Sequence, residues 1–341
     1  MRTIDWVDDG IELIDQTLLP ERCETLRLET VDGLIGAIRR LSVRGAPALG
    51  VAGALGVALA VATERDPADA ITRLRAARPT AVNLAWGVDE AARHVAEGFP
   101  AVLRRALAIR DDDIAACRSM GEYGTALLTG LLGEDGTGIR IMTVCNTGGL
   151  AAVERGTALG VVQTLHERGR LAEALALETR PLLQGARLTA WELGRMGAPY
   201  RMIVDSAGPF LLARGHADAV LIGADRIAAN GDTANKVGSY ALALGARRAG
   251  VPFVVVAPET TVDMATPSGA EIAIEDRPAE EVVTLRELRL APHDAGAINP
   301  AFDVTPHDLI TAIVTDRRIV RLDRAETLAS VPPGPRAAMP S

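Results

Sequence analysis

Cys145 is the residue in this sequence whose setting first suggests chemistry. It ends an apolar run and precedes a polar, Gly-rich turn in the stretch "IMTVCNTGGLA", residues 141 to 151. A thiol in such a turn can act as a nucleophile or base where a helix N-terminus or a cation lies beside the sulfur. A single cysteine is also commonly a small buried hydrophobe, so this stretch alone leaves both interpretations open.

Asp225 is the second candidate, in the stretch "GADRIAANGDTANK". It follows the apolar segment "AVLIGA", where partial burial would keep a carboxylic acid protonated near neutral pH. The alternative is that Asp225 only caps a turn, as Asp often does. Asp232, in a Gly-Asp turn of the same stretch, is predicted to be structural.

Two segments carry cations where an anion could bind. Asn235 and Lys236 are predicted to open a helix, where backbone N–H groups and a cation suit a phosphate, unless Lys236 is simply solvated. Arg44 and Gly45 precede a predicted helix whose Pro47 suits the first turn, although helix-start geometry alone would also explain these residues.

Arg78, in "RPTAVNL", is a further cation whose role its surroundings leave open. The five His residues are scattered, so no metal site is predicted. A Gly-rich dinucleotide fingerprint, a Walker loop and a paired-His metal helix are all missing from the sequence.

The elements that must position these residues fall into two parts. Helical spacing covers 31–41, 46–62, 84–108 and 112–132, and after the Gly-rich break "GEDGTG" short β-branched runs alternate with helix-length segments, including a helix at 234–249. The runs are 139–144, 175–178, 201–205, 219–223 and 252–257. This alternation predicts an α/β chain: a mainly helical N-terminal domain (1–130), then a doubly wound parallel-sheet domain (131–341) with a flexible Pro-rich tail.

In open parallel sheets, ligands bind beyond the carboxyl ends of the strands. Cys145 follows the first predicted strand and Asp225 the fourth, so the two should share one edge of the sheet. Polar residues follow the other strand ends as well, namely Glu178, Thr179, Arg180, Asp205, Ser206 and Arg226.

Composition excludes several classes of protein. The 341 residues carry a net charge of -8, which gives no electrostatic footprint for nucleic acid. Three widely separated cysteines fit neither a disulfide framework nor paired zinc-ligand spacing, and they suit a reducing cytoplasm. The apolar run 46–62 is short and rich in Ala and Gly, so a packed core helix is predicted there and no membrane span. The acidic N-terminus lacks a signal-peptide core.

Eight segments in order resemble the methylthioribose-1-phosphate isomerase family, which is related to ribose-1,5-bisphosphate isomerases and to regulatory initiation-factor subunits. They are "IDQTLLP", "VRGAPALG", "RPTAVNLAW", "TVCNTGGLA", "ETRPLLQGARLTAWEL", "GADRIAANGDTANKVGSY", "VPFVVVAPETTVD" and "INPAFDVTP". The resemblance implies a Rossmann-like catalytic domain, a homodimer and an aldose-ketose isomerisation in methionine salvage that needs no metal or redox cofactor. It also implies catalysis by Cys145 and Asp225, and substrate contacts from Arg44, Gly45, Ala46, Arg78, Gln184, Asn235 and Lys236.

The alternatives stay open at this point. The same site could isomerise 5-deoxyribose 1-phosphate, or ribose 1,5-bisphosphate if a second cationic subsite is present. A regulatory, protein-binding member of the superfamily is the alternative outside enzymology. Retention of Cys145 and Asp225 argues against it, because an interaction module has no use for a thiol and an acid on one sheet edge.

Overall fold

The centre of the molecule is a seven-stranded sheet. The structure is a computed structural model that describes residues 2–79, 81–133, 138–286 and 288–335. Its strands lie in the order β16-β15-β10-β7-β4-β5-β6, and all neighbouring pairs are parallel except β15 with β16. Their bounds are β4 Ile139–Thr143, β5 Leu171–Leu177, β6 Tyr200–Ile203, β7 Ala219–Ile222, β10 Phe253–Val256, β15 Ala312–Val314 and β16 Ile319–Val320. The five predicted parallel strands are thereby confirmed.

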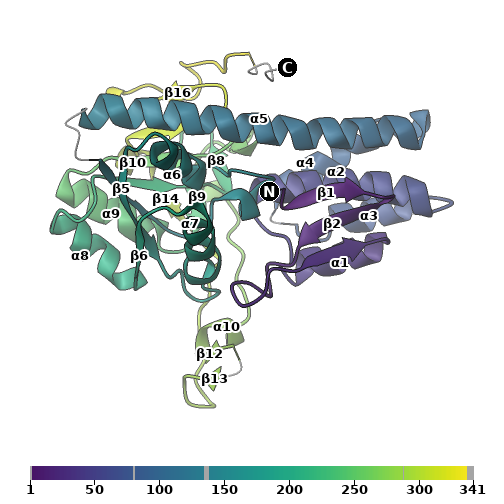
Figure 1. The fold of residues 1–341 in the computed structure, drawn as a ribbon, viewed down its shortest axis with the longest axis horizontal. Coiled ribbons are helices and arrows are strands. Elements are labelled where there is room, and N and C mark those ends of the chain that lie inside the picture. Colours follow the sequence, from purple (N-terminus) through teal and green to yellow (C-terminus); the bar gives the residue numbers. More distant parts are fainter. Residues whose placement is uncertain (1, 80, 134–137, 287, 336–341) are drawn as a thin grey trace.

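Helices cover both faces of this sheet, as predicted for a doubly wound fold (Figure 1). Alternate strand residues point to opposite faces, so Leu221 joins one buried cluster and Val220 the other. The first face packs against α5 (Phe99–Leu132), α6 (Ala158–Glu167) and α7 (Ala190–Met196). The second packs against α8 (Gly208–Ala213) and α9 (Ser239–Ala249).

The N-terminal part is mainly helical, but it also contains a small antiparallel sheet that the helical spacing did not predict. Its strands are β1 (Ile4–Val7), β2 (Gly10–Ile14) and β3 (Thr25–Leu28), and its helices are α1 (Val31–Arg39), α2 (Ala46–Thr63), α3 (Ala68–Arg75) and α4 (Val82–Ala92). The strands are only four or five residues long, which is too short for an alternating pattern to stand out in the sequence.

Helix α2 is the described helix whose length and composition would suit a membrane span, yet most of it is buried inside the molecule. It is buried without interruption from Pro47 to Ala60. The structure therefore supports the predicted core helix. Its glycines let α4 approach closely: a Cβ added at Gly87 of α4 would lie 2.0 Å from the carbonyl oxygen of Gly50 in α2.

Helix α5 corrects the prediction of two helices at 84–108 and 112–132. The chain breaks earlier, at Gly98, whose φ of 87° and following Pro100 start a new helix that then runs unbroken to Leu132. Its side chains join the N-terminal core up to Ile114 and the sheet core from Cys117 onward. Figure 1 shows α5 lying along both parts. The division into 1–130 and 131–341 stays a prediction.

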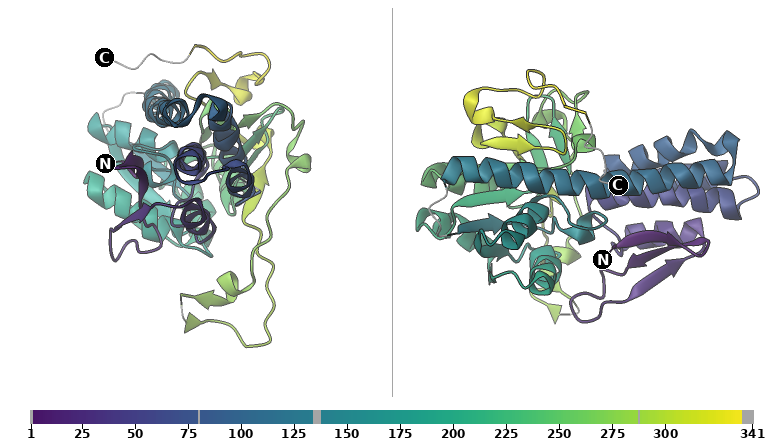
Figure 2. Two further views of the ribbon diagram at one scale, coloured as in Figure 1. Left: turned by 90° about the vertical axis from the view of Figure 1, so that its right-hand side faces the viewer. Right: turned by 45° about the horizontal axis from the view of Figure 1, so that its top comes forward.

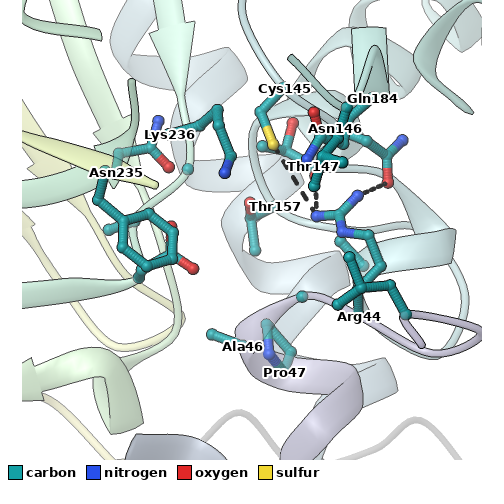
Figure 3. Close-up of a pocket in the computed structure, with 18 of the residues that line it drawn as sticks. Arg44, Ala46, Pro47, Cys145, Asn146, Thr147, Thr157, Gln184, Asn235 and Lys236 are labelled. Atoms are coloured by element: carbon teal, nitrogen blue, oxygen red, sulfur yellow. Dashed lines mark hydrogen bonds between the residues drawn. The ribbon is translucent and has the colours of Figure 1, made fainter. Parts of the chain in front are cut away.

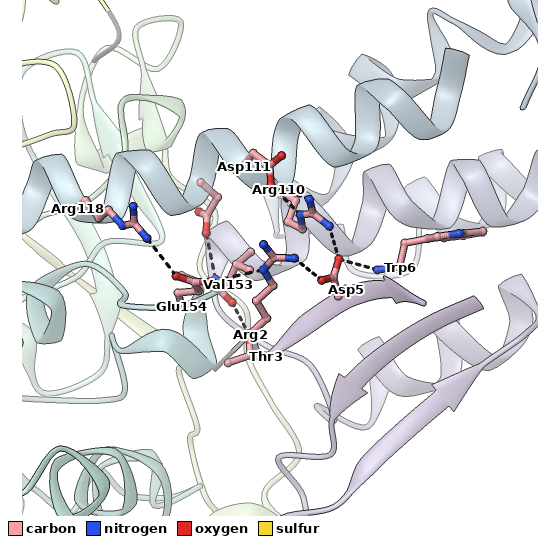
Figure 4. Close-up of polar contacts among 11 residues, drawn as sticks. Arg2, Thr3, Asp5, Trp6, Arg110, Asp111, Arg118, Val153 and Glu154 are labelled. Carbon is pink, nitrogen blue, oxygen red and sulfur yellow. Dashed lines mark hydrogen bonds and ion pairs between the residues drawn. The ribbon is translucent and has the colours of Figure 1, made fainter. Parts of the chain in front are cut away.

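A polar cluster joins the two parts beside the N-terminus (Figure 4). Asp5 of β1 pairs with Arg110 of α5, and Arg2 lies 3.5 Å from Glu154. The backbone N–H of Thr3 donates to the carbonyl of Val153 (2.9 Å). The loop that follows "TVCNTGGLA" is thus fastened to the N-terminal sheet.

A second, four-stranded sheet has the order β11-β8-β9-β14, with β8 Arg226–Ala228, β9 Thr233–Lys236, β11 Val262–Asp263 and β14 Phe302–Thr305. Between β11 and β14 the chain runs out into an arm that ends in α10 (Glu280–Val283), β12 (Thr284–Leu285) and β13 (Leu288–Arg289) (Figure 2). Short single turns complete the described chain: 95–97, 149–151, 185–189, 205–207, 259–261, 269–271, 307–309 and 322–324. Residues 336–341 of the predicted flexible tail lie outside the described residues.

Substituting Gly87 by Ala is expected to destabilise the protein by roughly 1–3 kcal/mol, because the new methyl group would force α4 away from α2. The matched control is Gly130→Ala in α5, where a Cβ would meet nothing within 4 Å. That change should stabilise the protein by up to about 1 kcal/mol through helix propensity. Thermal unfolding followed by circular dichroism measures both, and equal shifts would contradict the close α2–α4 packing.

Candidate active site

All nine residues predicted for the site line one pocket, beyond the carboxyl ends of the sheet strands (Figure 3). The start of α2 closes the pocket from the N-terminal side. The strand-edge rule thus correctly predicted that Cys145 and Asp225 lie close together. The other lining residues are Leu41, Pro47, Asn146, Thr147, Ala151, Thr157, Leu182, Gly223, Ala224, Pro258, Arg277 and Phe302.

Cys145 follows β4 in a strained backbone conformation with φ of 66°. Its N–H donates to Thr179 Oγ1 (2.9 Å), and its carbonyl accepts from Thr189 Oγ1 (2.7 Å). The residue is 7% exposed. Two threonines thus hold a left-handed turn that a cysteine adopts only where its surroundings enforce it, a pattern typical of functional sites.

The groups beside the Cys145 sulfur are cationic. Arg44 Nη2 lies 4.0 Å from Sγ, and Lys236 is close enough for its charge to interact with that sulfur. The sequence suggested a helix N-terminus at this place, but the next α-helix begins only at Ala158. Side-chain cations, rather than the start of the next helix, therefore lie where they would stabilise a negative charge on the sulfur.

Asp225 lies in the turn after β7 and is partly buried. Burial raises the pKa of its carboxyl above the ordinary value, although Lys236, Arg78 and Arg44 act in the opposite direction. This is the direction predicted from the sequence, and it suits a group that must carry a proton near neutral pH.

Lys236 and Asn235 correct the predicted helix at 234–249, since both lie in β9, which pairs with β8 and with β14. Helix α9 starts only after Gly238, whose φ of 106° turns the chain. The Asp303 carboxylate accepts the N–H groups of Gly238 and Tyr240 and so caps this helix. The cation for which the sequence suggested a helix start is thus presented from a strand.

The Lys236 ammonium is buried and has few partners. Nζ donates to the carbonyl of Ala301 (2.8 Å) and lies 4.9 Å from the centre of the Phe302 ring. Desolvation lowers the pKa of Lys236, and the nearby Cys145 and Asp225 raise it. Asn235 Nδ2 donates to Ser239 Oγ (2.8 Å).

The start of α2 reaches the pocket because residue 45 is a glycine. Gly45 has φ of 96°, and a Cβ there would lie 2.5 Å from the Cα of Ala151. The first turn of α2, including Ala46, is therefore held against the pocket with its free backbone N–H groups. Arg44, just before it, donates from Nη1 to Asn146 Oδ1 and from Nη2 to the Asn146 carbonyl, both at 3.0 Å.

Two further predicted residues complete the lining. Arg78 lies 3.8 Å from Glu275, and burial lowers the pKa of its guanidinium. Gln184 is 5% exposed, and within the described part of the chain its Oε1 accepts no hydrogen bond. A buried acceptor of this kind can receive a ligand hydroxyl.

The remaining strand-end residues have supporting roles. Asp205 accepts the N–H groups of Thr179 and Arg180, each at 2.7 Å, and so steadies the threonine that holds Cys145. Asp232 accepts from Asn230, Gly269 and His307, and these bonds lower its pKa to about 2 despite partial burial. The structural role predicted for Asp232 is therefore supported.

Sequence reasoning missed several lining residues. Asn146 and Thr147 stand inside the quoted motif, so their polar character next to Cys145 was an available signal. Arg277 lies in the arm, which no periodicity in the sequence marks, and Phe302 begins β14 inside the quoted segment "INPAFDVTP". Among the described residues no group of His, Cys, Asp and Glu is arranged to hold a metal ion.

Such a pocket at the edge of a doubly wound sheet is typical of α/β proteins that bind a small ligand. The model of the initiation factor 2 subunit family matches residues 42–320, and the chain belongs to that family. This confirms the predicted superfamily.

Similar proteins carry more specific names. A methylthioribose-1-phosphate isomerase of an Anaeromyxobacter strain is 49% identical over 95% of both chains. A 5-deoxyribose 1-phosphate isomerase of Moorella thermoacetica is 44% identical over 96% of this chain and 96% of its own length. A probable bifunctional methylthioribose-1-phosphate isomerase/methylthioribulose-1-phosphate dehydratase of Nocardia farcinica is 48% identical over 94% of this chain, which spans 60% of that protein.

Two solved structures share the fold closely. The 5-methylthioribose 1-phosphate isomerase of Pyrococcus horikoshii OT3 superposes with a TM-score of 0.86 at 40% identity, covering 94% of this chain and 92% of the other. A protein described as the delta subunit of translation initiation factor eIF-2B from A. fulgidus superposes with a TM-score of 0.82 at 39% identity, covering 97% and 99%.

Asp225→Asn should make the protein more stable at pH 7 to 8. Because burial raises the folded-state pKa, ionising Asp225 costs stability as the pH rises from its unfolded-state pKa of about 3.9 through the folded-state value. The gain should therefore vanish near pH 3 to 4. Thermal unfolding midpoints between pH 3 and 8 measure it.

The control for this experiment is Asp232→Asn, which should act with the opposite sign. Its folded-state pKa of about 2 lies below the unfolded value, so its stabilisation is present above about pH 4 and is lost as the pH falls through about 2. A less stable Asp225→Asn protein at pH 8 would contradict the predicted desolvation of Asp225.

Proposed function

We propose that this chain is an aldose-ketose isomerase that converts S-methyl-5-thio-α-D-ribose 1-phosphate to S-methyl-5-thio-D-ribulose 1-phosphate in cytoplasmic methionine salvage. The observation that carries the proposal is the meeting of Cys145 and Asp225 in one pocket with Arg44, Arg78 and Lys236. The relatives named as methylthioribose-1-phosphate isomerases support the same activity.

Asp225 is assigned the role of acid. In a sugar 1-phosphate the anomeric oxygen carries phosphate, so the ring cannot open by loss of a hemiacetal proton. The ring oxygen must accept a proton as the bond from C1 to that oxygen breaks. A carboxyl whose pKa is raised by burial can deliver that proton, and it regains one when the C2 hydroxyl becomes the ketone.

Cys145 is assigned to the transfer of hydrogen from C2 to C1. In one route the thiolate removes the C2 proton and returns it to C1 through an enol intermediate. In the other route hydrogen moves directly as hydride to the electron-poor C1, and the sulfur stabilises positive charge or orients the C2 hydroxyl. The cations Arg44 and Lys236 stabilise negative charge on the sulfur in both routes.

The phosphate is proposed to bind where the start of α2 meets Arg44 and Arg78. Gly45 and Ala46 supply backbone N–H groups, and the arginines supply charge-assisted hydrogen bonds. Gln184 and Asn235, with Lys236, are assigned to the sugar hydroxyls; the unpaired Oε1 of Gln184 suits a donor hydroxyl.

The pocket favours an uncharged group on C5. A bisphosphate would need a second cationic subsite, and the additional cation in the lining, Arg277, is already paired with Glu275 (2.8 Å) and Glu281 (2.5 Å). Leu41, Leu182 and Phe302 give the lining an apolar portion. Both a methylthio and a 5-deoxy sugar fit this description, so 5-deoxyribose 1-phosphate is the second candidate substrate, which the Moorella relative also suggests.

The regulatory alternative fits the site less well. The likeness to an initiation-factor subunit is a likeness of fold and sequence. A pocket that buries a thiol and a carboxyl among cations costs stability, and a protein-binding surface would gain nothing from that cost.

The activity is tested by supplying 1-phosphates of 5-methylthioribose, 5-deoxyribose and 5-phosphoribose and following conversion by phosphorus and carbon NMR. Wild-type protein should convert the first two and leave the bisphosphate largely unchanged. Cys145→Ser and Asp225→Asn should each lower kcat by about 10²- to 10⁴-fold, the usual contribution of a positioned acid or base. Full turnover in either variant would remove that residue from the mechanism.

The same reaction in deuterium oxide separates the two routes. Deuterium at C1 of the product requires a proton exchanged with solvent, whereas a hydride shift keeps the original hydrogen. For the kcat values of Cys145→Ser and Asp225→Asn, the control is Asp232→Asn. Asp232 lies outside the pocket, so this change should leave kcat within about twofold.

A homodimer is proposed as the working form. Strand β6 lies at the open edge of the sheet, and Tyr200, Met202 and the following Val204 expose apolar side chains there. Helices α8 and α9 expose Phe210, Tyr240 and Leu244. Exposed apolar side chains and an open sheet edge are typical of a subunit interface.

Light scattering after size exclusion should therefore give twice the mass of 35.8 kDa. Phe210→Glu and Leu244→Glu should shift the protein toward the monomer mass of 35.8 kDa, since a carboxylate buried without a partner in the interface opposes association. Ile298→Glu, at an exposed residue on the arm, is the matched control and should leave the mass unchanged. A monomeric wild-type protein would overturn this proposal.

A further inference from the structure

The position of Arg44 depends on a carboxyl group that lies outside the pocket. Glu192, on α7, is 7% exposed and is not part of the lining. Its carboxylate sits behind the loop that carries Cys145 and the two glycines of "TVCNTGGLA", and that loop closes around it.

The groups bonded to Glu192 are all donors. Oε2 accepts from Asn146 Nδ2 (2.6 Å), and Oε1 accepts from the backbone N–H of Leu150 (3.0 Å). The backbone N–H of Gly149 also favours the charged form of this carboxylate. An ionised carboxylate accepts on every side, whereas a protonated one must also donate. The surroundings of Glu192 therefore match its charged form.

The glycines in the motif make room for this carboxylate. A Cβ at Gly148 would lie 2.2 Å from Glu192 Oε2, and one at Gly149 would lie 3.3 Å from Oε1 and 1.7 Å from the carbonyl oxygen of Glu154. The loop can reach Glu192 only without side chains at these two positions. The motif "NTGG" and the Glu of "TAWEL" are thus parts of one arrangement.

Asn146 connects Glu192 to the pocket. Its Nδ2 faces the Glu192 carboxylate and lies 3.3 Å from Thr189 Oγ1, so its Oδ1 faces the opposite way. That oxygen accepts from Arg44 Nη1 (3.0 Å), while Arg44 Nη2 donates to the Asn146 carbonyl (3.0 Å) and lies 4.0 Å from the Cys145 sulfur. If the amide turned over, its NH₂ group would face the guanidinium, and donor would meet donor.

We infer that Glu192 is a positioning residue that holds Arg44 against the substrate and Cys145 by fixing the orientation of the Asn146 side-chain amide. This inference rests on the proposed function, in which Arg44 contacts the phosphate. Glu192 touches neither substrate nor sulfur itself. It acts through one amide.

The charge state of Glu192 adds a second prediction to the same geometry. Desolvation raises the pKa of Glu192 to about 7, although Asn146, Leu150, Arg44 and Gly149 all lower it. Arg44, just before α2, is the charged side chain whose field acts on the Glu192 carboxylate. The loop 146–150 faces the same carboxylate with the side-chain amide of Asn146 and the backbone N–H of Leu150. Protonation as the pH falls through about 7 would favour the reversed amide and release Arg44.

The test is a double-mutant cycle between Glu192→Gln and Arg44→Ala. Glu192→Gln should raise KM by about 10- to 100-fold, the range for losing a hydrogen bond to a charged group, with a smaller change in kcat. In the Arg44→Ala background the same change should have little further effect, because there is no guanidinium left to position. Additive effects, or an unchanged KM in Glu192→Gln, would overturn the inference.

The pH dependence gives a second readout. In wild-type protein KM should rise below about pH 7, and this rise should be absent from Glu192→Gln, which cannot ionise. The matched control is Asp113→Asn on α5, another buried carboxyl whose pKa burial raises to about 7 but which accepts from the Val153 N–H away from the pocket. Its KM should keep the wild-type pH profile.

Two further measurements test the role of Glu192 if the Glu192→Gln variant does not fold or if the protein lacks the proposed activity. If Glu192→Gln does not fold, Asn146→Ala removes the same connection from the other side and must show the same non-additivity with Arg44→Ala. If wild-type protein turns over none of the sugar phosphates, the proposed function fails. The cycle is then measured as stabilisation against thermal unfolding by inorganic phosphate, and equal stabilisation of wild type and Glu192→Gln overturns the inference separately.

Discussion

The contact between Gly45 and Ala151 is the constraint on which the site depends. The two parts of the molecule have separate hydrophobic cores, and the pocket takes residues from both parts. Because residue 45 has no side chain and a positive φ, the start of α2 lies directly against the loop that follows Cys145. Any larger residue would separate the cations of the N-terminal part from the thiol and carboxyl of the sheet.

The geometry of parallel strands explains why the position of the candidate site was largely predictable while parts of the fold were not. Cys145 and Asp225 follow buried parallel strands, and strand ends meet at one edge whatever the intervening loops do. The predicted helix start made Arg44 a candidate, and the surroundings of Arg78 left its role open; only the family resemblance assigned both arginines to the substrate. Their burial in the pocket follows from contacts with residues far away in the sequence, namely Glu275 for Arg78 and Asn146 for Arg44.

The errors have physical causes of the same kind. Thr233–Lys236 forms a strand because β8 and β14 offer hydrogen bonds on both sides, and a four-residue segment shows no periodicity of its own that could reveal this. The prediction ended one helix at residue 108 and began the next at 112, yet α5 continues through this stretch, and Asp113 accepts from the Val153 N–H across the junction. The arm brings Arg277 and Phe302 to the pocket from distant segments, and only the folded chain places them.

The two arginines Arg44 and Arg277 show why Glu192 acts through an amide. Arg277 is paired directly with Glu275 and Glu281, so its positive charge is already balanced, and an arriving phosphate would have to displace carboxylates. Arg44 bonds to the neutral Asn146, and the nearest carboxylate in that network lies one residue further away. An amide transmits orientation without cancelling charge. The guanidinium is thus fixed in place while its charge stays available for the phosphate, and the cost of burying Glu192 is borne by its own hydrogen bonds to the glycine loop.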